Sequence, residues 1–101
     1  MNKILKNLLL IVVFNSITNL GAQETFILNY EDVDIKKVTQ DIAQFSKKTI
    51  ILDPRVKGKI TIYSNANLDR DQVWDVYLRT IQVNGFGAIS EDGFLRVVPE
   101  N

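Results

Sequence analysis

The chain has 101 residues, with 12 acidic and 12 basic side chains and neither histidine nor cysteine. This length suits one small domain, and the missing residue types exclude a thiol nucleophile, the commonest general base and most transition-metal sites. The balanced charge argues against general nucleic-acid binding, which needs a basic excess to neutralise phosphates.

Residues 1–22 have the layout of a secretory signal peptide. Lys3 and Lys6 precede an unbroken apolar run from Leu8 to Phe14, and Leu20-Gly21-Ala22 can serve as a cleavage site. The apolar run is far shorter than the roughly 20 residues that span a bilayer. We therefore favour a signal peptide over a membrane anchor, with the mature chain starting after Ala22 and carrying a small acidic excess.

The first strand is predicted at Phe26 to Tyr30, where apolar side chains recur at every second position. Both faces of this strand carry an apolar residue, so we expect partial cover on each side. Glu31, Asp32 and Asp34 follow, and we interpret them as the start of a helix rather than as a metal site. Asp34 suits an N-cap, and neighbouring carboxylates complement the positive end of a helix dipole.

Two helices are predicted from apolar spacing. An apolar stripe indicates the first, from Asp34 to Lys47, and Asp69 with Gln72 has the spacing of a capping box for the second, which ends near Asn84. The stripe consists of Ile35, Val38, Ile42 and Phe45. We place Trp74 and Tyr77 in the core rather than in a ligand-stacking platform, with the Tyr77 hydroxyl in solvent.

Four more strands are predicted. Thr49 to Leu52 and Ile60 to Ile62 flank a stiff, basic surface loop that contains Pro54 and Gly58. Phe86 to Ser90 and Phe94 to Val98 form a hairpin around Glu91-Asp92-Gly93. We expect the Phe26 strand to pair with the Ile60 strand, and the Ile50 strand to join the hairpin.

These features favour a binding or assembly module over an enzyme, and no cofactor or metal is expected. The Phe26 to Tyr30 strand is a candidate open sheet edge, which a partner strand can extend. Five basic side chains also lie within a short stretch, opposed only by Asp53, and they indicate either a solvated loop or a match to an acidic neighbour. They are Lys47, Lys48, Arg55, Lys57 and Lys59.

The run from Asp53 to Thr61 resembles the first periplasmic domain of type II secretion secretins, the outer-membrane ring proteins through which folded proteins leave diderm bacteria. Weaker matches flank it, and the resemblance covers residues 24–99. They are Phe26 to Tyr30 with Val33-Asp34-Ile35, Val83 to Phe86, and Phe94 to Pro99. The resemblance implies an α+β fold with two helices between a two-stranded and a three-stranded sheet, in the order β-α-β-β-α-β-β.

The resemblance also implies a periplasmic domain that contacts the inner-membrane clamp component and neighbouring secretin subunits, with exported cargo as a further candidate. Membrane contact would come only through a barrel outside these residues. By analogy, the first and third strands form the partner-binding zone. Its residues are Phe26, Ile27, Leu28, Asn29, Tyr30, Lys59, Ile60, Thr61, Ile62 and Tyr63.

Two alternatives stay open. The same fold family includes signalling domains of TonB-dependent outer-membrane receptors, which contact an inner-membrane regulator, although the Asp53 to Thr61 run favours the secretin. A free periplasmic solute binder would require a concave pocket. The sequence stops at Asn101, so it corresponds to a truncated product, a partial gene or a free-standing copy of the domain. It also departs from the family at Lys47, where glycine is common.

Overall fold

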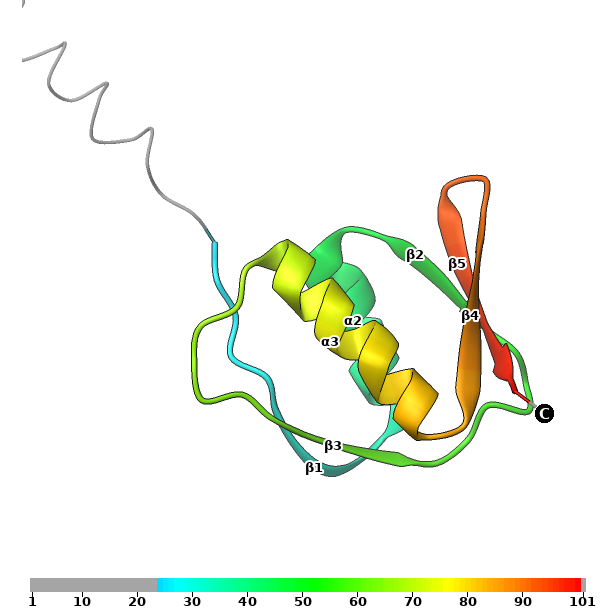
Figure 1. Ribbon diagram of the computed structural model, residues 1–101, viewed down its shortest axis with the longest axis horizontal. Coiled ribbons are helices and arrows are strands. Elements are labelled where there is room, and N and C mark those ends of the chain that lie inside the picture. The colour runs from blue at the N-terminus through cyan, green and yellow to red at the C-terminus, as the bar shows by residue number, and fades with distance from the viewer. Residues whose placement is uncertain (1–23, 101) are drawn as a thin grey trace, which may run out of the picture.

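The computed structural model describes residues 24–100, and the predicted signal peptide at 1–22 lies outside that range. Seven elements follow one another, with two helices lying between two separate sheets (Figure 1). In chain order they are β1 (Asn29–Asp34), α2 (Ile35–Ser46), β2 (Thr49–Leu52), β3 (Lys59–Tyr63), α3 (Arg70–Val83), β4 (Phe86–Glu91) and β5 (Phe94–Pro99).

The sheets have the predicted composition. β1 pairs antiparallel with β3, whereas β5 lies between β2, to which it is parallel, and β4, to which it is antiparallel. The predicted α+β class, the element order and both pairings are therefore confirmed. The parallel β2–β5 pair is made possible by the long intervening chain, because parallel neighbours cannot be joined by a tight turn.

Both helices begin where side-chain chemistry favours a start. Asp34 caps α2 by accepting a hydrogen bond from the Lys36 amide at 2.8 Å. Asp69 and Gln72 form a complete capping box at α3, each side chain bonding to the other's backbone amide. These bonds satisfy amides that have no partner inside a helix, so both helix starts are fixed locally.

At the C-terminal end of α2, Lys47 occupies the position where glycine is common in the family. Lys47 adopts the left-handed conformation, with φ of 54°, and its amide donates to the Ala43 carbonyl. A β-carbon makes this conformation cost roughly 1–2 kcal/mol. The turn therefore keeps a glycine-type geometry at an energetic cost, and the departure at Lys47 leaves the fold intact.

The first strand begins later than predicted. β1 starts at Asn29, while Phe26 makes an isolated antiparallel bridge to Leu68, and the strand continues to Asp34 through a register shift between Tyr30 and Val33. Asp32 has φ of 56° within this bulge. The interpretation of Glu31 and Asp32 as helix-initiating residues is therefore wrong, because a bulge absorbs them into the strand.

A pair of hydroxyl groups lies in the core, one of which was predicted to lie in solvent. Tyr77 is 1% exposed, and its hydroxyl lies 3.0 Å from Thr39 Oγ1 across the contact between α2 and α3. Placement of Tyr77 in the core is confirmed, but the prediction of a solvated hydroxyl is wrong. Burial raises the pKa of Tyr77, although the Thr39 hydrogen bond partly opposes this shift.

The loop between β2 and β3 also contributes to the core. Val56 is 1% exposed, although its neighbours Arg55 and Lys57 point to solvent. The Val56 amide donates to the Asp53 carbonyl at 2.9 Å and the Asp53 carboxylate accepts from the Arg55 amide at 2.9 Å, which closes a tight turn. The wet, basic loop is therefore anchored by one buried valine.

Candidate protein-protein interface

The predicted partner-binding zone lies on the two-stranded sheet, and the structure divides it between the two faces of that sheet. In β3, exposed and buried residues alternate strictly from Lys59 to Tyr63. Asn29 pairs with Tyr63 and Tyr30 with Ile62, so each β1 residue shares a face with its β3 partner. Only one face of the zone is therefore open to another protein.

Half of the predicted residues point inward. Leu28, Ile60 and Ile62 are 0%, 2% and 8% exposed and belong to the core. Phe26 stacks on Phe45 of α2 with ring centroids 4.7 Å apart, and Tyr30 is half-buried. These five side chains pack against the core and support the sheet from its inner side.

The other five predicted residues form the outer surface, which we call the Ile27–Tyr63 face. Ile27 and Tyr63 are 64% and 67% exposed, so two large apolar side chains lie next to each other on one surface. Ile27 precedes Asn29, the partner of Tyr63, by two positions and therefore shares its side of the strand. The face consists of Ile27, Asn29, Lys59, Thr61 and Tyr63.

The bulge in β1 shapes the polar end of this face. The Asp32 amide donates to Thr61 Oγ1 at 3.0 Å, and Lys59 Nζ lies 3.7 Å from Asp32 Oδ2. A bulge bends its strand and interrupts the regular row of backbone groups. The zone is consequently better suited to contact through the Ile27 and Tyr63 side chains than to addition of a long partner strand along β1.

A hydrogen-bonded cluster fixes β1 onto α2 beneath the face. The Tyr30 hydroxyl donates to Asp41 Oδ2 at 2.8 Å, and Lys37 donates to Asp41 Oδ1 at 2.9 Å. Burial, and then the Asp41 hydrogen bond and charge, raise the pKa of Tyr30. Burial acts to raise the pKa of Asp41, but the hydrogen bonds from Lys37 and Tyr30 outweigh it and lower that pKa.

Two side chains of the basic stretch, Arg55 and Lys59, pair with acidic side chains of the domain itself. Lys48 and Arg55 lie beyond opposite ends of β2. Arg55 pairs with Asp53 at 2.9 Å and its hydrogen bonds lower the pKa of Asp53 to about 2. Lys59 faces Asp32, as described above, and Lys48 Nζ lies 5.3 Å from the centre of the Trp74 ring. The pairing of Arg55 and Lys59 within the domain favours the interpretation of this stretch as a solvated loop.

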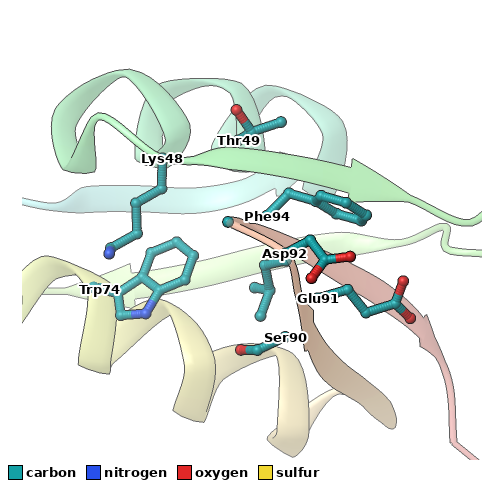
Figure 2. A pocket seen from close by; sticks show the side chains of 9 residues that line it. Lys48, Thr49, Trp74, Ser90, Glu91, Asp92 and Phe94 are labelled. Carbon is teal, nitrogen blue, oxygen red and sulfur yellow. The ribbon is translucent and has the colours of Figure 1, made fainter.

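One cavity, of about 300 Å³, lies between the start of β2, the tip of the β4–β5 hairpin and α3. Figure 2 shows Lys48 beside Trp74 on one side of it and Ser90, Glu91 and Asp92 on the other. Glu91 also pairs with Arg96 at 2.9 Å. The lining mixes apolar and oppositely charged groups, and its carboxylates belong to a hairpin turn.

Within residues 24–100, no group of three or more acidic, histidine or cysteine side chains is placed to hold a metal ion. Over the same range, the two helices are too short or too polar to cross a membrane.

The architecture, two capped helices between a bulged two-stranded sheet and a three-stranded sheet, defines a small α+β domain of the kind found at the start of secretins. The family model for the GspD-like N0 domain matches residues 28–97. The chain therefore belongs to the GspD-like N0 domain family, and its recognition as a type II secretin N-terminal domain is confirmed.

Curated relatives agree with this assignment. The secretin XcpQ of Pseudomonas aeruginosa is 29% identical over 84% of this chain and 13% of its own length, and the secretin PulD of Klebsiella pneumoniae is 33% identical over 77% and 12%. The sequence thus spans about an eighth of the curated relatives it matches. These relatives support the assignment to the secretins. They do not support the alternative of a signalling domain from a TonB-dependent receptor.

Solved structures show the same fold. The N0 domain of the type II secretin from enterotoxigenic Escherichia coli has a TM-score of 0.72 and 31% identity, covering 79% of this chain and all of that one. A GspC–GspD complex from the type II secretion system of the same organism matches with a TM-score of 0.67 and 27% identity, over 75% of this chain and 57% of that one.

Proposed function

We propose that this domain is a periplasmic docking module of a type II secretion secretin and that it contacts the inner-membrane component of the export machine. The observation that carries the proposal is the exposure of two large apolar side chains, Ile27 and Tyr63, on the outer face of the β1–β3 sheet. Membership of the N0 family and the solved GspC–GspD complex of a relative support it.

The composition of the Ile27–Tyr63 face suits a specific contact between proteins. A tyrosine with an exposed ring supplies apolar area and a hydroxyl at low entropic cost, and tyrosine is enriched among residues that dominate binding energy. Asn29, Thr61 and Lys59 continue the same face away from the two apolar side chains and add hydrogen-bonding groups. Interfaces between proteins usually combine apolar and polar contacts in this way.

The proposed location is the periplasmic side of an outer-membrane secretin complex. The relatives are secretins, and a structure of the Klebsiella pneumoniae type II outer membrane complex, which contains PulD, PulS and the PulC HR domain, matches this chain at 32% identity. The predicted signal peptide at 1–22 would direct the chain to the periplasm, and the domain would occupy residues 24–99. Neighbouring secretin subunits are proposed as further partners, and no step requires catalysis.

The direct test is capture with purified partners. Residues 23–101, immobilised through a C-terminal tag, are offered the periplasmic part of an inner-membrane type II secretion component and, separately, the periplasmic part of an anti-sigma regulator from a TonB-dependent system. The proposal expects saturable binding of the first and none of the second. Binding of the regulator alone would assign the domain to signalling.

A further inference from the structure

The cavity of about 300 Å³ lies where three segments of the chain meet. Lys48 enters it from the start of β2, Trp74 from α3, and residues 90–95 from the β4–β5 hairpin (Figure 2). Pockets that bind small molecules begin at about this volume. The cavity is therefore large enough for a compact ligand.

Apolar side chains form a fixed part of the lining. Leu95 is 5% exposed and belongs to the core, and Trp74 and Phe94 are half-buried. The Trp74 ring also packs against the buried Tyr77 ring, with centroids 6.0 Å apart. Because these side chains are held by the core, the apolar surface exists before any ligand binds.

Two charges of opposite sign are left for a ligand. Three charged side chains line the cavity, but Glu91 pairs with Arg96 at 2.9 Å. Within residues 24–100, neither Lys48 nor Asp92 takes part in an ion pair. Figure 2 shows them on opposite sides of the cavity, Lys48 beside Trp74 and Asp92 at the hairpin tip.

Both charges are attached to backbone that is fixed by hydrogen bonds. Asp92 and Gly93 are the two residues between the paired Glu91 and Phe94, and their φ values of 38° and 88° are those of a tight type I′ turn. The Lys48 amide donates to the Ala43 carbonyl at 3.1 Å, directly before β2. The positions from which the two charges extend are therefore set by the fold.

We propose that this cavity binds a short peptide of two or three residues through its free, charged ends. Lys48 receives the carboxylate and Asp92 receives the ammonium group, while Trp74 and Leu95 contact the apolar part of the peptide. The Ser90 hydroxyl offers a hydrogen-bonding group to the peptide bonds between the two ends.

The arrangement of charge favours this class of ligand over simpler ones. A ligand with a single charge meets one attractive and one repulsive side chain, whereas a zwitterion matches both. In a free amino acid the two charged groups share one carbon atom and cannot reach opposite sides of the cavity. Three extended residues span up to roughly 10 Å, which separates the two groups.

The inference does not rest on the proposed function. The cavity borders the three-stranded sheet, whereas the Ile27–Tyr63 face lies on the two-stranded sheet. Peptide binding and binding of the inner-membrane component can therefore be lost independently, and failure of one leaves the other standing.

Fluorescence of Trp74 tests the proposal, because it is the single tryptophan of the chain and lines the cavity. Residues 23–101 are titrated with tri-alanine, with its N-acetylated form, with its C-terminally amidated form and with free alanine. We expect a saturable change at millimolar tri-alanine and at least about tenfold weaker binding of each other compound. Backbone amide shifts of Ser90 and Gly93 in NMR spectra follow the same titrations independently of the fluorescence.

Two variants assign the two ends of the peptide separately. Asp92→Asn, which keeps a residue that tolerates positive φ, should bind the free and the acetylated peptides equally but still prefer a free carboxylate. Lys48→Gln should show the reverse. Lys57→Gln is the matched control, because Lys57 is exposed and lies outside the lining. It should leave every affinity unchanged, and circular dichroism should show that all variants fold.

Four results would overturn the proposal. They are the absence of saturable binding by both fluorescence and NMR, equal binding of free and capped peptides, equal binding of alanine and tri-alanine, and unchanged selectivity in Asp92→Asn and Lys48→Gln. A preference for a free ammonium group alone would likewise contradict it, since the cavity would then be a site for cations.

Discussion

The Tyr77 hydroxyl and Thr39 Oγ1 lie 3.0 Å apart in the buried contact between α3 and α2. Tyr77 is among the largest fully buried side chains, and Thr39 is 5% exposed, so neither group reaches water. A buried polar pair is favourable only while both partners remain. This bond therefore fixes how the two helices sit against each other, and with them the two sheets.

Removal of one partner should reveal this role. Tyr77→Phe keeps the ring but leaves Thr39 Oγ1 without its partner, and should lower the free energy of unfolding by about 1–3 kcal/mol in urea denaturation. Thr39→Val combined with Tyr77→Phe removes both partners and should cost less than the sum of the single changes. Strict additivity would contradict a direct bond.

Alkaline pH should destabilise the fold through Tyr30. Because its pKa is raised in the folded state, the neutral phenol contributes stability that is fully present below the ordinary tyrosine value of about 10 and is lost as pH rises through the folded pKa. Urea denaturation between pH 8 and pH 11 should show this loss. Tyr30→Phe should make the loss shallower, and an unchanged slope would contradict the Tyr30–Asp41 bond.

The left-handed residue at the end of α2 predicts a stabilising substitution. Lys47→Gly relieves the β-carbon penalty at φ of 54° and should raise the free energy of unfolding by about 1 kcal/mol, despite the greater freedom of glycine in the unfolded chain. Gln40→Gly, at an exposed position inside the same helix, should lower it by about 1 kcal/mol. Equal changes in the free energy of unfolding for Lys47→Gly and Gln40→Gly would argue against a left-handed cap at Lys47.

Helix ends and hairpin turns could be predicted because they depend on neighbouring residues. Asp69 with Gln72 specifies its cap within four positions, and Gly93 supplies the positive φ of 88° that the turn requires. The extension of β1 from Tyr30 to Asp34 could not, because Asp32 occupies a bulge that is stabilised by Thr61, far away in the sequence. Burial of the Tyr77 hydroxyl could likewise not be predicted from the sequence, since its partner Thr39 belongs to another helix.

The resemblance assigned the candidate interface to two strands but did not distinguish their two faces. The resemblance pointed to both strands of the sheet, and their pairing in the structure brings the predicted residues together. Alternation in β3 could have indicated that Ile60 and Ile62 share one side and Thr61 and Tyr63 the other. Which side faces the helices depends on the packing of Leu28 and the core, and that follows only from the assembled fold.

The central claim is that the Ile27–Tyr63 face binds the inner-membrane component, and a calorimetric titration of that component with three forms of residues 23–101 tests it directly. Loss of a residue that dominates an interface costs about 2 kcal/mol or more, so Ile27→Asp with Tyr63→Ala should weaken binding at least about 30-fold. Ile51→Asp, which alters an exposed isoleucine on the other sheet, should bind like the unmodified chain. Equal affinity of all three forms, with folding intact, would contradict the account.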